Sequence, residues 1–114
     1  MKLEIKRVYD EPSSADGARI LVDRLWPRGL SKERAHVDVW LKDIAPSNEL
    51  RKWFGHDPEH WKEFQVRYRA ELRHNAATFE ELKKLVFKGP PTLLYGAKDE
   101  QHNEAVVLLD LLKR

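Results

Sequence analysis

The sequence predicts an α/β fold, in which a single small domain holds a short, mostly parallel sheet of about four strands flanked by helices. Its 114 residues are the usual length of one domain and can bury a core without disulfides. Four short segments have the apolar pattern of strands. Long helical patterns connect some of them, and parallel strands need such connections because the chain must return across one face of the sheet.

The first two strands are separated by a segment rich in turn-forming residues. Apolar and charged side chains alternate over residues 3–8, which predicts a half-buried strand that ends near residues 9–10. Residues 11–17 contain proline, serine and an Asp-Gly pair, which favour turns. The apolar character of residues 18–22 then predicts a second, more buried strand.

Serine residues mark the starts of two helices in the next part of the chain. Ser31 can cap a short helix that runs through His36, and the alternation over residues 37–41 predicts a third strand. Ser47 can accept bonds from the free backbone N–H groups of a helix over residues 48–54.

The longest helix is predicted to begin at Asp57 and Pro58, a capping residue followed by a proline at the first helical position. It should end near residues 73–74. Its apolar residues recur every three or four positions and therefore share one face: Trp61, Phe64, Tyr68 and Leu72.

The last part of the chain predicts a helix, a strand and a further helix. Thr78 and Glu81 have the spacing of a capping box, and the Gly-Pro-Pro sequence at residues 89–91 should end the helix that they begin. Residues 92–95 form a short apolar run typical of a buried strand. Residues 105–112 then have the amphipathic pattern of a terminal helix.

The composition excludes several classes of function. The chain has no cysteine, which rules out thiolate catalysis, disulfides and cysteine-ligated metal or iron–sulfur centres. Its formal net charge of +2 is far from the concentrated positive charge of a dedicated nucleic-acid-binding protein. Residues 1–7 alternate charged and apolar side chains, so we expect no signal peptide, no membrane span and a cytoplasmic location.

Polar residues gather where the predicted strands end, and the carboxyl ends of parallel strands meet at one edge of a sheet, where ligands bind. The four strand exits carry, in order, Arg7, Tyr9 and Asp10; Asp23, Arg24, Trp26 and Arg28; Lys42, Asp43 and Ser47; and Tyr95, Lys98, Asp99, His102 and Asn103. We expect a site for a small anionic ligand there, because guanidinium groups bind carboxylate or phosphate through paired hydrogen bonds. The predicted ligand-binding residues are Asp23, Arg24, Trp26, Arg28, Tyr95, Lys98 and Asn103. The alternative is that these are ordinary polar residues of exposed loops.

The segment from Asp23 to Gly29 is predicted to be a stiff turn. Pro27 fixes its own φ angle and favours an extended conformation at Trp26, which would hold the neighbouring arginines in place. Asp23 could orient one arginine and leave the other to meet the ligand, while the Trp26 ring excludes water or stacks on the ligand. The alternative is an internal Asp–Arg ion pair with Trp26 covering the core.

The loop from Tyr95 to Asn103 precedes the terminal helix, whose free N–H groups favour negative charge. Gly96 would let the backbone approach closely. His102 and Asp99 are the candidate catalytic residues, with His102 as a general acid–base because its imidazole titrates near neutral pH. The alternative is that Asp99 only caps the helix and His102 is a surface residue.

No cofactor or metal site is predicted. His56 and His60 mimic the spacing of a zinc-protease helix, but Pro58 starts a helix between them, so the two imidazoles should not share a face. The sequence contains neither a glycine-rich phosphate loop nor a serine nucleophile elbow.

Basic residues in two helical segments offer a second hypothesis, a regulatory module that binds nucleic acid or protein. Trp40 and Trp61 lie near these residues in sequence and could stack on bases. Glutamates are interleaved among them, which instead favours a solvated face with local ion pairs. A domain that dimerises through exposed tryptophans is a third hypothesis. The basic residues are Lys32, Arg34, Lys62, Arg67, Arg69 and Arg73.

The chain resembles the YeaO-like branch of a bacterial family, the domain of unknown function 488 family. The resemblance is carried by residues 16–29 (DGARILVDRLWPRG), 40–47, 50–54, 68–72 and 92–103, and therefore spans almost the whole chain as one YeaO-like α/β domain. It implies a small cytosolic protein without an established activity. The resemblance also implies that related branches carry a cysteine in a rhodanese-like loop after the last strand. The matching loop here, Tyr95–Asn103, has none, so we do not expect sulfur transfer.

Overall fold

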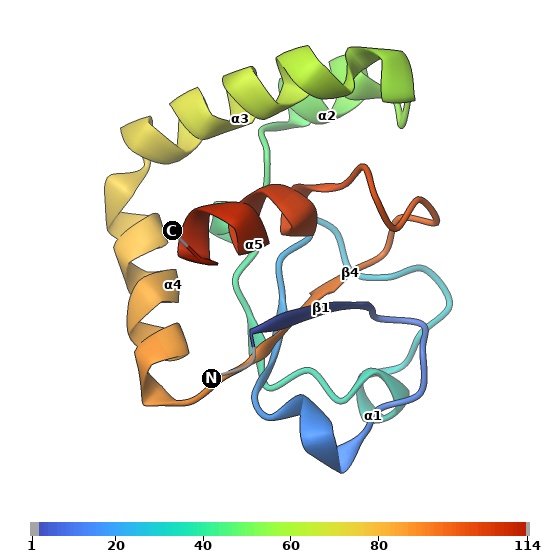
Figure 1. Cartoon of the computed structure of the whole chain (residues 1–114). Coiled ribbons are helices and arrows are strands. Elements are labelled where there is room, and N and C mark those ends of the chain that lie inside the picture. The colour runs from blue at the N-terminus through green and yellow to red at the C-terminus, as the bar shows by residue number, and fades with distance from the viewer. Residues whose placement is uncertain (1–2, 114) are drawn as a thin grey trace.

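The fold is that of a small α/β domain, as the sequence predicts. The computed structural model describes residues 3–113, and its sheet contains four strands in the order β1-β4-β2-β3, with every neighbouring pair parallel (Figure 1). The strands are β1 (Glu4–Arg7), β2 (Arg19–Leu21), β3 (Val39–Trp40) and β4 (Thr92–Tyr95). The third strand is shorter than the predicted segment 37–41, and the two central strands, β2 and β4, are buried throughout.

Helices and single 3-10 turns connect the strands. The helices are α1 (Lys32–Ala35), α2 (Asn48–Phe54), α3 (Trp61–His74), α4 (Ala76–Lys88) and α5 (Glu104–Lys113), and the 3-10 turns are η1 (Ser14–Asp16), η2 (Lys42–Ile44) and η3 (Pro58–His60). Two predicted serine caps are confirmed. The Ser31 hydroxyl accepts the Arg34 N–H at 3.2 Å, and the Ser47 hydroxyl accepts the Leu50 N–H at 3.1 Å.

The predicted capping box at Thr78 and Glu81 is wrong, because α4 already begins at Ala76. Only Asn75 separates α3 from α4, and its carbonyl accepts the backbone N–H groups of both Thr78 and Phe79. The Asn75 side chain also donates to the Asp43 carbonyl at 3.0 Å. This contact ties the junction to η2, so tertiary structure sets the start of α4 two residues before the predicted cap.

The sheet has a core on each face, which explains why β2 and β4 are apolar without alternation. Ile20 and Leu93 lie in the larger cluster, with residues of α2, α3, α4 and α5. Leu21 and Leu94 point to the opposite face and pack with Ala35 of α1. Figure 1 shows α5 between the sheet and α3, which agrees with the contacts of α5 to β1, β4 and α3. No helix among the described residues is long and apolar enough to span a membrane.

A buried ion pair stabilises the segment that the sequence marks only as a turn. The Arg19 guanidinium binds the Asp16 carboxylate and donates to the carbonyls of Ala35 and His36, each at 2.9 Å. Burial on its own would raise the pKa of Asp16, but bonds from the Ser13 N–H, Arg19 and Lys6 lower it overall. The pair therefore anchors η1 and the end of α1 to the start of β2.

Candidate functional site

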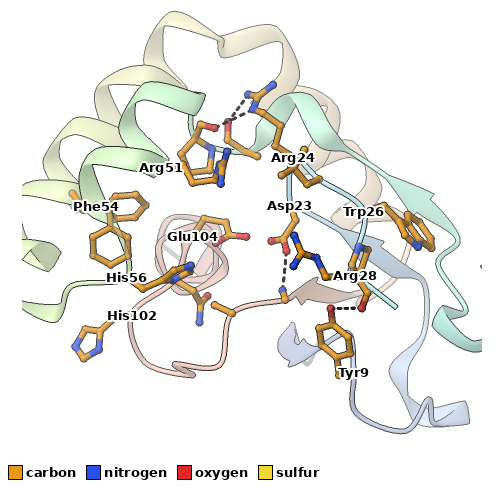
Figure 2. Close-up of a pocket in the computed structure, with 18 residues that line it drawn as sticks. Tyr9, Asp23, Arg24, Trp26, Arg28, Arg51, Phe54, His56, His102 and Glu104 are labelled. Atoms are coloured by element: carbon orange, nitrogen blue, oxygen red, sulfur yellow. Dashed lines mark hydrogen bonds between the residues drawn. The ribbon is translucent and has the colours of Figure 1, made fainter. Parts of the chain in front are cut away.

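A cavity of about 260 Å³ lies at the carboxyl ends of the two central strands (Figure 2). It is enclosed by the turn after β2, the loop between β4 and α5, and the end of α2. Its lining residues are Tyr9, Asp23, Arg24, Leu25, Trp26, Pro27, Arg28, Ala45, Pro46, Arg51, Phe54, His56, Phe64, Gly96, Ala97, His102, Asn103 and Glu104. This is the sheet edge at which the sequence predicts a site, because β2 and β4 are neighbours and their exits meet there.

Asp23 joins the two strand exits to each other. Its Oδ2 accepts the Gly96 N–H at 2.8 Å, and its backbone carbonyl accepts Nε1–H of Trp40 at 2.8 Å. A Cβ atom at Gly96 would lie 2.9 Å from the same Oδ2, so the close approach needs a glycine. Within residues 3–113 Asp23 forms no ion pair with an arginine, so its carboxylate orients the β4 exit and does not orient a guanidinium.

Glu104, the first residue of α5, brings a second carboxyl group to Asp23. Burial, the hydrogen bond to Asp23 and the negative charge of Asp23 raise the pKa of Glu104 well above its ordinary value. The raised pKa favours the protonated form of Glu104 beside the Asp23 carboxylate, because one ionised carboxyl group opposes the ionisation of its neighbour. This favours less negative charge at this wall of the cavity than two ionised carboxylates would carry.

Three arginines line the same cavity. Arg24 donates to two backbone carbonyls, from Nε to Pro46 at 3.1 Å and from Nη2 to Ala45 at 3.1 Å. Arg28 is exposed, and its backbone carbonyl accepts the Tyr9 hydroxyl at 2.9 Å. Arg51 on α2 is exposed and has one long bond, 3.4 Å, to the Asn48 side chain. In the described part of the chain none of these three guanidiniums pairs with a carboxylate.

Trp26 packs against the smaller core cluster and also lines the cavity. Its Nε1–H donates to the Leu30 carbonyl at 2.6 Å, and its ring meets the Trp40 ring edge-on with centroids 5.5 Å apart. It is therefore a fixed wall of the cavity, held by the same stiff turn that carries Arg24 and Arg28.

The loop before α5 is built on Asp99 and Asn103. Hydrogen bonds from the Gln101 N–H and from His102 lower the pKa of Asp99, whose Oδ2 lies 2.8 Å from Nδ1 of His102. Asn103 caps α5, because its Oδ1 accepts the Val106 N–H at 3.1 Å, and its amide donates to the Asp99 carbonyl at 2.9 Å. Asp99 thus orients His102, and Asn103 takes the capping role that the sequence analysis weighed for Asp99.

Six of the nine predicted site residues line the cavity, namely Asp23, Arg24, Trp26, Arg28, His102 and Asn103. The other three do not line it. Tyr95 is buried in the sheet, and this burial raises the pKa of its hydroxyl. Lys98 is exposed on the loop, and Asp99 reaches the cavity only through His102.

Sequence reasoning missed Arg51, Phe54, His56 and Glu104. The first two lie on one helix, where nothing in the sequence marked a ligand-facing side. His56 has a φ of 57°, a left-handed conformation that is uncommon outside glycine, and it follows Gly55 at 55°. The Gly55 stop after α2 was the available signal, because the turn it forms brings His56 to the cavity. Glu104 directly follows Asn103, which the sequence did single out.

Two basic residues of α3, Arg67 and Arg69, form ion pairs. Arg67 pairs with Glu63 and covers the Trp53 ring, with its guanidinium carbon 4.3 Å from the ring centroid. Arg69 pairs with Asp110 of α5 at 3.0 Å. These contacts agree with the interpretation of this surface as a solvated face with local ion pairs.

The cavity offers charge and hydrogen bonds more readily than covalent chemistry. Its lining residues include two imidazoles, three guanidiniums and the Asp23–Glu104 carboxyl pair, but no serine, threonine or cysteine nucleophile. Among residues 3–113 no group of three or more histidine, aspartate or glutamate side chains is arranged to hold a metal ion.

Comparison with known proteins confirms the family resemblance. Residues 2–114 match the family described as the inactive DUF488-N3 subclade. The uncharacterised protein YeaO of Escherichia coli K12 is 45% identical over 113 residues, which cover 99% of this chain and 98% of that protein. The uncharacterised protein Rv3073c of Mycobacterium tuberculosis H37Rv is 41% identical over 111 residues, 97% and 93% of the two chains. No solved structure matches the chain.

Proposed function

The chain belongs to the inactive DUF488-N3 subclade, and from this premise we propose that it is a binding domain for a small anionic ligand, which it holds without turnover. The observation that carries the proposal is the set of three guanidiniums, Arg24, Arg28 and Arg51, around one cavity without a carboxylate partner in the described chain. Positive charge without a counterion in a concave site favours an anion from solution.

The arginines supply both position and charge. Arg24 is fixed by two carbonyl groups, which orient its guanidinium without neutralising it. A group that is already ordered loses less conformational entropy when the ligand binds. Arg28 and Arg51 keep most of their N–H donors free for a carboxylate or phosphate, to which a guanidinium donates two parallel bonds.

The Asp23–Glu104 pair is compatible with an anion because the raised pKa of Glu104 favours its protonated form, which lowers the negative charge beside the ligand. Absence of turnover is supported by the description of the subclade as inactive and by the cysteine-free loop after β4. The His102–Asp99 pair remains the candidate acid–base for any residual reaction. We keep the cytoplasm as the expected compartment.

The proposal is tested by thermal-shift screening of inorganic phosphate, nucleotides and small carboxylates, followed by calorimetric titration of whichever compound raises the Tm. Arg28→Ala should weaken binding by about 10-fold or more, since a hydrogen bond to a charged group contributes about 1.5–3 kcal/mol. Arg34→Ala is the matched control, because Arg34 is exposed on α1 and outside the cavity. Equal affinity of wild type and Arg28→Ala would contradict the proposal.

A further inference from the structure

We propose that the ligand of this cavity is a zwitterion, with an ammonium group held by Asp23 and Glu104 and an anionic group held by Arg28 and Arg51. The ligand class is therefore an amino acid or an aminoalkyl phosphate. This inference rests on the proposed function, because it keeps the anion on the arginines and adds a second recognised group.

Opposite charges line this cavity without pairing across it. The two acids come from the β2 exit and from the start of α5, whereas the two exposed arginines come from the turn after β2 and from α2. No ion pair between these acids and arginines occurs within residues 3–113. In a concave site such groups are stabilised when a ligand supplies the opposite charge to each.

The geometry at the acids suits an ammonium group. Figure 2 shows the carboxyl groups of Glu104 and Asp23 turned toward one another. Oδ2 of Asp23 accepts the Gly96 N–H, and the Asp23 carboxylate also forms the hydrogen bond with Glu104. An ammonium has three N–H donors and no acceptor, so it can donate to oxygen atoms of both side chains.

A ligand with only one charge would leave half of the site unsatisfied. A simple anion on Arg28 and Arg51 would leave the negative charge of the carboxyl pair without a cation, and a simple amine would leave both guanidiniums without an acceptor. The volume of about 260 Å³ is suited to a small ligand. Arg24, His56 and His102 complete the charged and titratable lining.

The test is a calorimetric titration of the full chain, at a single pH, with linear ω-amino acids of one to five methylene groups. Each is compared with the carboxylate of equal length that lacks the amine and with the amine that lacks the carboxylate. At least one chain length should bind about 10-fold or more tightly than its matched carboxylate, because two charge-assisted bonds are added. The same series on phosphates compares O-phosphoethanolamine with ethyl phosphate.

Variants connect the preference to the acids. In Glu104→Gln the affinity ratio of amino acid to carboxylate should fall toward one, whereas Glu100→Gln, an exposed change in the same loop, should preserve the ratio. Asp23→Asn provides the same test if Glu104→Gln does not fold. Carboxylates or phosphates that bind as tightly as their amino analogues would overturn the zwitterion inference and leave anion binding intact. No binding by any member of either series would overturn both.

Discussion

The contact between Gly96 and Asp23 provides the sharpest test of how the site is assembled. A methyl group at position 96 would lie 2.9 Å from Oδ2 of Asp23, closer than carbon and oxygen atoms pack. Gly96→Ala must therefore displace the carboxylate by about 0.5 Å and weaken the 2.8 Å bond from the Gly96 N–H. Gly96 does not have a positive φ, so the backbone itself accepts alanine.

The expected cost is about 2 kcal/mol of unfolding free energy, the range of an overpacked site or a lost bond to a charged group. For a chain of 114 residues this corresponds to a fall in Tm of about 8 °C. Urea denaturation measures the cost. Gly89→Ala is the matched control, because its new methyl group would meet no atom within 4 Å.

A double-mutant cycle isolates the cause. In an Asp23→Ala background the clashing oxygen is gone, so adding Gly96→Ala should cost less than about 0.5 kcal/mol. If Gly96→Ala costs as much in that background as in the wild type, contact with Asp23 is not the reason for the glycine. That result would refute the conclusion that the Asp23–Gly96 contact joins the exits of β2 and β4.

Three further changes follow from the same contacts. Asp16→Asn should lower the unfolding free energy by about 3–5 kcal/mol at neutral pH because it leaves Arg19 buried without its partner. Since the fold lowers the pKa of Asp16, the difference from wild type in urea denaturation should shrink as the pH falls below the ordinary pKa of 3.8. A difference that does not depend on pH would contradict this. The fold raises the pKa of Glu104, so the unfolding free energy should decline as pH rises above its ordinary 4.5, and Glu104→Gln should flatten that decline; an unchanged slope would refute the carboxyl pair. Asn103→Ala should lower stability by about 1 kcal/mol through loss of the α5 cap, whereas Asn103→Asp should restore most of it.

Local chemistry explains why the fold and part of the site were predictable. Ser47 and the proline-bounded run at residues 92–95 carry their structural signal within a few residues, and both predictions are confirmed. Asp23 and Arg28 could be placed at the cavity because they lie in the turn that leaves β2, and parallel strands bring their exits together whatever the details of the loops.

The parts that could not be predicted depend on contacts between distant residues. Asn75 begins α4 because its side chain is bound to Asp43, 32 residues away. Glu104 was missed because its role depends on Asp23, 81 positions earlier in the sequence. Arg24 donates hydrogen bonds to the backbone carbonyls of Ala45 and Pro46 in another loop. An arginine that the sequence suggests for ligand binding therefore also holds two loops together. No pattern in the sequence carries these pairings.

The central claim is that a small anion binds at the arginines of this cavity, and an NMR titration tests it most directly. Inorganic phosphate, or the best anion from the screen, would be added to uniformly ¹⁵N-labelled protein at constant ionic strength. Anion binding at the arginines should give saturable shifts in the Nε–H signals of Arg28 and Arg51 and in the backbone amide signal of Gly96. The backbone amide signals of Lys83 and Lys84 on α4 should not shift. Shifts that fail to saturate, or that spread equally over the exposed lysines and arginines, would contradict this claim.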